Sequence, residues 1–192
     1  MRLIDIAFDL DGTLIHLMPV FEDIIWKMYK AKLPRNREFK IFTKPELDYP
    51  TIKWCFGEAF RRYEEFEIVP GVRELFSKLY ELSDGDPIKI ITARPYSSAE
   101  CTYRLVERIC KDICDWEVII VKNGDNKIKH LKRYGHFVDD RRKTCLHLSS
   151  YRKTVWMPKK TYNQPMAGHL VNQIESFEYL TDKASWFIKE VL

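Results

Sequence analysis

Two acidic residues stand close together in the stretch FDLDGTL, which follows an apolar run near the start of the chain. The carboxylates of Asp9 and Asp11 repel each other, and their burial is costly unless a cation or a proton compensates the charge. A divalent cation such as Mg²⁺, which takes oxygen ligands and keeps waters for a phosphate, would resolve the repulsion. Without further partners, the pair would be only a polar turn.

Three further apolar runs are followed by polar residues that suit the same chemistry. Residues 92–94 (TAR) end one run, Lys122 and then Lys127 follow the next, and residues 139–141 (DDR) follow another. In open α/β sheets, functional groups collect at the carboxyl ends of the strands. Carboxylates, a hydroxyl and a lysine at adjacent strand ends would be hard to stabilise without a cation. The pattern therefore predicts one site that is built from distant parts of the chain.

Short runs rich in Ile and Val are expected to form the strands that carry these residues. The runs are residues 3–8, 88–92, 117–121, 136–138 and 154–157. They are almost continuously apolar, which is typical of a parallel sheet covered on both faces. Helical patterns separate them, and this alternation predicts an α/β fold with a doubly wound, Rossmann-like parallel sheet.

The helices between these strands are predicted from apolar residues at helical spacing. The expected helices are residues 72–82, 97–114, 127–134 and 143–151, followed by C-terminal helices near 169–180 and 182–190. Ser97 and Glu100 stand in the positions of a capping box at the start of the second helix. These helices would cover the sheet.

The segment of residues 16–68 interrupts the alternation, because it contains no convincing strand. Apolar residues at helical spacing predict one helix around residues 20–28 and another around residues 52–63. Between them, residues 33–50 contain three prolines and no clear period. We therefore expect a small helical insertion at residues 16–68 in a core made of residues 1–15 and 69–192.

Composition and length favour a folded, water-soluble protein. The 192 residues are 45% hydrophobic and 31% charged, and no apolar run approaches the roughly 18 residues that span a bilayer. Because the chain enters an expected strand at once, we expect no signal peptide. The five cysteines form no CxxC pair, so we expect reduced thiols and a cytoplasmic location. A net charge of +4 favours anionic partners only slightly.

The motifs at the strand ends resemble those of the haloacid dehalogenase (HAD) superfamily of phosphotransferases. The first motif, DxDGT, corresponds to Asp9, Asp11, Gly12 and Thr13, and the second to Thr92 in IITAR. A lysine and the acidic pair in FVDDR follow in the expected order. The insertion after the first motif is similar to the helical C1-type cap of the superfamily. Dehalogenases of the superfamily lack the second aspartate, so its presence here favours phosphate chemistry.

The resemblance implies a Mg²⁺-dependent phosphatase that hydrolyses phosphate monoesters. Asp9 would attack phosphorus and form an aspartyl-phosphate. Asp11 would protonate the leaving oxygen and then deprotonate the water that hydrolyses the intermediate. The implied phosphate-binding residues are Gly12, Thr13, Thr92, Ala93 and a lysine, which offset the charge of the transition state.

The resemblance also implies a set of metal ligands and a choice among lysines. The implied Mg²⁺ ligands are Asp9, Asp11 (through its backbone carbonyl), Asp139 and Asp140. We favour Asp140 as the direct ligand of the acidic pair and Asp139 as its close partner. Lys127, which opens an expected helix, is the preferred phosphate-binding lysine, and Lys122 and Lys129 remain alternatives.

Several details resemble the 5′(3′)-deoxyribonucleotidase branch of the superfamily. They are the size and place of the insertion, VPGVREL at residues 69–75, TARP at residues 92–95, DDR at residues 139–141 and YN at residues 162–163. This resemblance implies a (deoxy)nucleoside monophosphate as substrate. The aromatic residues of the insertion that are available to stack on a base are Phe21, Trp26, Tyr29, Trp54 and Phe56. Trp26 is the first candidate, because it lies least cleanly on the apolar stripe.

Other interpretations of the sequence remain open. The stretch from Lys27 to Lys44 contains seven basic residues, both ends included, and such a run can attract a polyanion. A phosphatase acting on nucleic-acid ends, or on another small phosphorylated metabolite, is therefore the alternative. A phosphomutase would use the same aspartates, and a HAD-like protein can also bind a nucleotide or a partner without turnover. We expect no membrane association, and the sequence leaves the oligomeric state open.

Overall fold

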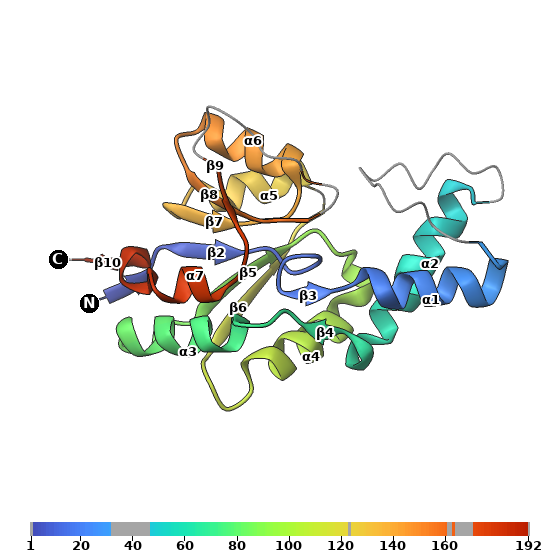
Figure 1. Cartoon of the computed structure of the whole chain (residues 1–192), viewed down its shortest axis with the longest axis horizontal. Helices are drawn as coiled ribbons and strands as arrows, with labels where there is room; N and C mark the ends of the chain where they lie inside the picture. The colour runs from blue at the N-terminus through green and yellow to red at the C-terminus, as the bar shows by residue number, and fades with distance from the viewer. Residues whose placement is uncertain (1, 32–46, 123, 161–162, 164–170, 192) are drawn as a thin grey trace.

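Six parallel strands form the central sheet of the computed structural model, in the order β6-β5-β2-β7-β8-β9 (Figure 1). The structure describes residues 2–31, 47–122, 124–160, 163 and 171–191. The strands are β2 (Ile6–Phe8), β5 (Ile88–Thr92), β6 (Trp116–Ile120), β7 (His136–Val138), β8 (Thr154–Pro158) and β9 (Val171–Ile174). The predicted α/β fold with a doubly wound parallel sheet is confirmed.

Alternate residues of the central strands enter two separate hydrophobic clusters, one on each face of the sheet. In β2, Ile6 and Phe8 belong to one cluster, whereas Ala7 belongs to the other. The same alternation occurs in β7, where Val138 joins the first cluster and Phe137 the second. Burial on both faces explains why these strands are apolar almost throughout.

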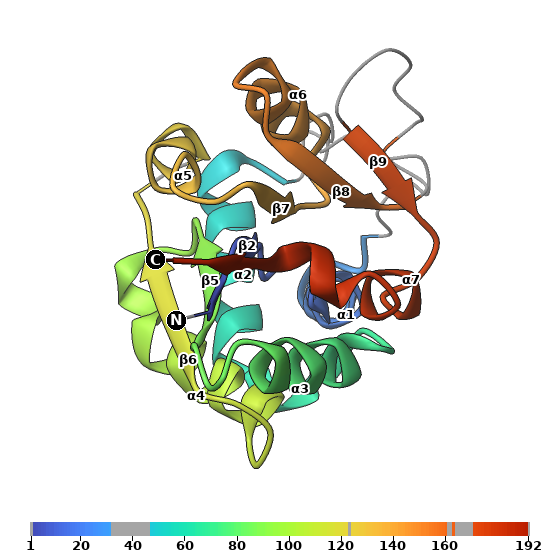
Figure 2. The ribbon, with the colours of Figure 1, turned by 90° about the vertical axis from the view of Figure 1, so that its left-hand side faces the viewer.

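Helices cover both faces of the sheet (Figures 1 and 2). On one face lie α3 (Val72–Leu82) and α4 (Ala99–Cys110), and on the other lie α5 (Gly124–Leu131) and α6 (Arg142–Ser150). The predicted capping box of α4 is wrong. The helix begins at Ala99, after the 3-10 turn η3 (Tyr96–Ser98), and no side chain caps it. Its N-cap residue, Ser98, instead donates its hydroxyl to the carbonyl of Pro95 at 2.7 Å.

The predicted C-terminal helices are largely wrong. Residues 171–174 form β9, an edge strand of the central sheet, and residues 169–170 lie outside the described part. Only single turns follow, α7 (Glu178–Thr181) and η4 (Ala184–Phe187), before the strand β10 (Ile188–Glu190). The buried side chains here are Ile174, Phe177, Leu180, Ala184 and Phe187. Their spacing of three to four residues imitates a helix, although short turns and strands place them.

The predicted first strand is two strands, divided at Asp5. β1 (Arg2–Ile4) pairs antiparallel with β10, so the first and last described segments lie side by side (Figure 2). The backbone N–H of Asp5 donates to the carbonyl of Phe187 at 2.7 Å, and its carboxylate accepts from the N–H of Gly135 at 2.9 Å. These bonds turn the chain from the two-stranded sheet into the central one.

Two helices inserted after β2 pack against each other and project from the sheet beyond the carboxyl end of β2 (Figure 1). They are α1 (Met18–Tyr29) and α2 (Tyr49–Arg61), here called the helical pair, and the short turn η2 (Tyr63–Glu65) follows them. The rings of Phe21 and Phe56 stack between them, with centroids 4.1 Å apart. Met28, the last apolar residue of the predicted helix around residues 20–28, is 58% exposed, so the apolar pattern does not mark a buried side chain at that position.

A short antiparallel ribbon joins the helical pair to the rest of the chain. It consists of β3 (Ile15–His16) and β4 (Glu67–Ile68). The expectation that residues 16–68 contain no strand is therefore wrong at both ends of that segment. Two-residue strands are too short to show the alternation by which a strand is recognised.

All five cysteines are free thiols in the structure, and the expected reducing environment stays a prediction. Among the described helices, none has the length and apolar character needed to cross a membrane. The cytoplasmic location stays a prediction.

Candidate active site

The motif residues come together at the carboxyl ends of three neighbouring strands. β2 lies between β5 and β7 in the sheet, and these three strands are followed by Asp9, residues 92–94 and residues 139–140, respectively. Because parallel strands end at the same edge of a sheet, the polar groups that follow them share one site. The predicted convergence of the motifs is thus observed.

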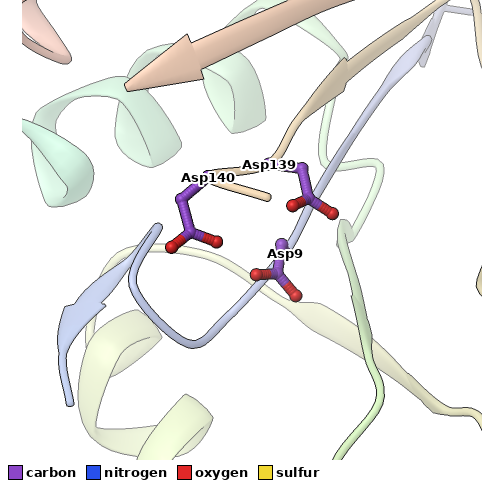
Figure 3. A group of neighbouring side chains, drawn as sticks. All are labelled: Asp9, Asp139 and Asp140. Atoms are coloured by element: carbon purple, nitrogen blue, oxygen red, sulfur yellow. The ribbon is translucent and has the colours of Figure 1, made fainter. Parts of the chain in front are cut away.

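Three aspartates, Asp9, Asp139 and Asp140, lie close together in a buried cluster at this edge (Figure 3). One oxygen from each of Asp9, Asp139 and Asp140 lies within 4.8 Å of the others. None of the three residues is more than 6% exposed. Three hard oxygen donors at such separations match the ligands that Mg²⁺ prefers.

Lys127, at the middle of α5, places its ammonium group against this cluster. Its Nζ donates to Oδ1 of Asp9 and, at 2.9 Å, to Oδ2 of Asp139. The lysine side chain is only 3% exposed. Lys122 and Lys129 are exposed, so among the three candidates Lys127 is the lysine that the structure brings to the aspartates.

The charges at the cluster do not balance within the hydrogen-bonded group. If all three carboxylates are ionised, the hydrogen-bonded ammonium of Lys127 offsets one of three negative charges, and the charge of Asp140 also acts on Lys160. The pKa of Asp9 is raised to about 7, chiefly by burial; the attraction of Lys127 opposes this rise, and the charge of Asp139 contributes to it. Burial alone would lower the pKa of Lys127, but the charges of Asp139 and Asp9 outweigh it and raise that pKa. A divalent cation would supply the missing charge.

A tight turn after Asp9 brings the hydroxyl of Thr13 between Asp9 and the acidic pair of residues 139–140. Gly12 has a φ of +78°, which L-residues with side chains rarely adopt. Its N–H donates to the carbonyl of Ile15 at 3.1 Å. The turn lets Thr13 donate its hydroxyl to Oδ2 of Asp9 at 3.4 Å and accept the N–H of Asp140 at 3.1 Å. Thr13 therefore ties the two aspartates together.

The second motif contributes a buried hydroxyl and a buried guanidinium. Thr92 ends β5, and its Oγ1 accepts the backbone N–H of Arg94 at 3.4 Å, with the half-buried Ala93 between them. Arg94 donates from Nε to Oδ2 of Asp11 at 2.9 Å and from Nη2 to Oδ1 at 2.6 Å. Both oxygens of Asp11 are thus held by Arg94. Sequence reasoning did not assign Arg94 to the site, although its position directly after a strand end was visible.

Asn163 is a second residue that sequence reasoning left almost unused. It is buried, and its Nδ2 donates to the carbonyl of Asp140 at 3.0 Å and to that of Pro158 at 2.8 Å. Its Oδ1 accepts the N–H of Lys160 at 2.8 Å. The amide therefore fixes the backbone that carries Asp140. Tyr162 of the YN pair lies outside the described residues.

The aromatic residues of the helical pair fall into two groups. Phe21 and Phe56 stack on each other and contribute to the packing of the pair. Trp26, Tyr29 and Trp54 are exposed by 40–46%. The Nζ of Lys30 lies 5.7 Å from the ring centre of Trp26. The rest of the basic run, residues 32–44, lies outside the described part of the chain.

Solved structures of other proteins share the fold of this chain. No family model and no curated protein matches the chain. Solved structures do match, among them a HAD-superfamily hydrolase of subfamily IA, variant 1, from Geobacter sulfurreducens. It is 15% identical, with a TM-score of 0.56 over 94% of this chain and 99% of that one. The chain has the fold of the HAD-superfamily hydrolases.

Two other proteins with the HAD fold show how varied the matching structures are. A proposed β-phosphoglucomutase from Thermotoga maritima is 17% identical, with a TM-score of 0.59 over 94% of this chain and 98% of that one. A proposed phosphoglycolate phosphatase from Lactobacillus plantarum is 13% identical, with a TM-score of 0.60 over 95% and 99%. At these identities the likeness concerns the HAD fold, and the function depends on the site itself.

Proposed function

We propose that the chain is a Mg²⁺-dependent phosphatase that hydrolyses phosphate monoesters through an aspartyl-phosphate on Asp9. The observation that carries the proposal is the ammonium of Lys127 between Asp9 and Asp139, with Asp140 completing the cluster. Such a site can hold a phosphoryl group by its oxygens while a carboxylate attacks phosphorus. The HAD fold around it supports the same chemistry.

The donor set fits a magnesium ion. We propose Asp9, Asp140 and the backbone carbonyl of Asp11 as ligands, with Asp139 as a close partner. Both oxygens of Asp139 accept hydrogen bonds, one from Lys127 and one from the N–H of Arg141 at 2.7 Å, which favours Asp140 as the direct ligand. When bound, the ion would neutralise negative charge on the aspartates and on the phosphoryl oxygens.

The protein groups supply the covalent steps of the proposed reaction. An oxygen of Asp9 bonds to phosphorus as the bond to the leaving oxygen breaks, and Asp11 gives that oxygen a proton. Water then attacks phosphorus, its proton passes to Asp11, and the bond between phosphorus and Asp9 breaks. The phosphoryl oxygens would be held by Lys127, Thr13, Thr92 and the amide of Ala93, while Gly12, whose N–H donates to Ile15, forms the tight turn that brings Thr13 to the site.

For the substrate, we propose a (deoxy)nucleoside monophosphate, as in the 5′(3′)-deoxyribonucleotidase branch. Residues 16–68 would form a cap over a core of residues 1–15 and 69–192. The exposed rings of Trp26 and Trp54 on the helical pair are available to stack on a base. A small phosphorylated metabolite is the second candidate, because structures that share the fold include a proposed phosphoglycolate phosphatase. Nucleic-acid ends are a third candidate, for which the basic run is the reason.

Phosphate release with Mg²⁺ tests the proposal, and the substrates should include nucleoside monophosphates, sugar phosphates, phosphoglycolate and 3′-phosphorylated oligonucleotides. We expect release by the wild-type protein and none by Asp9→Asn. The same change at the exposed Asp84 is the control. Unchanged release by Asp9→Asn would refute the nucleophile, and transfer of phosphate within a sugar phosphate would indicate a mutase. Trp26→Ala should raise KM for nucleotides more than for phosphoglycolate if Trp26 contacts a base.

A further inference from the structure

Arg94 is an arginine whose side chain is fully buried, directly beside the candidate active site. Its guanidinium holds both oxygens of Asp11 through a fork of hydrogen bonds between 2.6 and 3.1 Å. Asp11 retains access to solvent, since its side chain is 22% exposed. Charge-assisted, forked pairs of this kind fix the direction of a carboxylate as well as its charge. The direction of Asp11 is thus set by a residue of the second motif.

Aromatic rings hold the guanidinium itself in place. The Cζ atom of Arg94 lies 4.4 Å from the ring centre of Phe60, near the end of α2, and 5.5 Å from that of Phe66. Both phenylalanines are buried. The Nη1 of Arg94 also lies 3.5 Å from the hydroxyl of Thr102, which donates to the carbonyl of Ser98 at 2.8 Å. A flat guanidinium stacks on aromatic faces in a way that a lysine ammonium does not reproduce.

We propose that Arg94 is a positioning residue that aims Asp11 at the attacking water, and that Phe60 links this pair to the helical pair. This inference rests on the proposed phosphatase function and extends it to two residues, Arg94 and Phe60, that the sequence motifs did not assign to the site. In the step concerned, the water oxygen bonds to phosphorus and its proton moves to Asp11. The bond between phosphorus and the oxygen of Asp9 breaks, which releases inorganic phosphate.

For substrates with a good leaving group, Arg94 should affect the second step, which is the hydrolysis of the aspartyl-phosphate. p-Nitrophenyl phosphate needs little help from an acid, because nitrophenolate leaves readily without a proton. Phosphorylation of Asp9 should then remain fast in Arg94→Lys, whereas hydrolysis of the aspartyl-phosphate should slow by about 100-fold, the typical cost of misplacing a reacting group. The variant should give a burst of about one nitrophenolate per protein, and phosphorylated protein should accumulate in acid-quenched samples.

Matched variants separate positioning from a general structural effect. Arg104, which pairs with Glu100 on the exposed face of α4, receives the same change to lysine and should keep the wild-type rate without a burst. In an Asp11→Asn background, Arg94→Lys should cause no further loss, because Arg94 acts through Asp11. Phe60→Leu, which removes only the ring under the guanidinium, should give a smaller burst of the same kind.

The outcomes distinguish this inference from the proposed function. If the wild-type protein releases neither nitrophenolate nor phosphate with Mg²⁺, the proposed phosphatase function fails. Suppose that the wild-type protein is active and that the Arg94→Lys variant folds. If that variant then shows neither a burst nor a slower steady-state rate, the positioning role is wrong. A further loss in the Asp11→Asn background would also overturn it. Should Arg94→Lys not fold, Phe60→Leu decides, and an unchanged course of nitrophenolate release in that variant refutes the proposal.

Discussion

The raised pKa of Asp9 predicts an unusual dependence of stability on pH in the metal-free protein. The pKa of Asp9 is about 7 in the folded protein, against an ordinary value of 3.8, chiefly because the carboxyl is buried. Between these values the folded protein holds a proton that the unfolded chain has released. The free energy of unfolding therefore falls as the pH rises through this window. Asp9→Asn has no such proton, so its stability relative to wild type should rise with pH.

The size of this effect follows from the two pKa values. One pKa unit corresponds to about 1.4 kcal/mol, and integration from pH 5 to pH 8 gives a relative stabilisation of Asp9→Asn of about 3 kcal/mol. Urea denaturation in the presence of a chelator, at several pH values, measures the difference. The same substitution at Asp84 provides the comparison curve. Saturating Mg²⁺ should reduce the difference, because a bound cation favours the ionised carboxylate.

A difference between Asp9→Asn and wild type that stays constant from pH 5 to pH 8 would refute this reasoning. Burial between Asp139 and Lys127 would then not hinder ionisation of Asp9.

Three further predictions concern the same site. Calorimetry should show Mg²⁺ affinity falling by up to about tenfold per pH unit below about pH 7, because a proton competes for Asp9; an affinity that is flat from pH 5 to pH 7 contradicts this. Lys127→Met leaves buried carboxylates uncompensated, so denaturation of the metal-free protein at pH 8 should show a loss of about 3–5 kcal/mol. Gly12→Ala forces a side chain to a φ of +78° and should cost about 1–2 kcal/mol in the same measurement; no loss would mean that the turn relaxes.

The sequence could predict the convergence of the aspartates because each one follows a buried strand of a parallel sheet. The apolar runs mark the buried strands, and the topology of a doubly wound sheet brings the carboxyl ends of these strands together. The choice of Lys127 over Lys122 and Lys129 depended on helix phase, which the sequence alone left open. The roles of Arg94 and Asn163 could not be predicted, since they depend on partners 83 and 23 positions away. Polar contacts of this kind have no local pattern.

The misassigned segments have a common physical cause. Residues 171–190 alternate between strand and single turns, and each element is too short for its own periodicity to appear. Buried residues such as Phe177 and Leu180 then mimic a helix by spacing alone. Pairing of β10 with β1 and of β9 with β8 is a tertiary effect, and tertiary contacts override local preference in such short elements.

The place of β2 in the middle of the sheet also has a consequence for how the chain acquires its shape. The neighbours of β2 in the sheet, β5 and β7, follow it only after long stretches of chain, and Lys127 follows Asp9 by 118 positions. Pairings over such sequence distances close large loops and slow folding. During synthesis, β2 can pair with β7 only after the chain up to Val138 has been made. The acidic centre also needs Asp139 and Asp140, so it cannot form before that point.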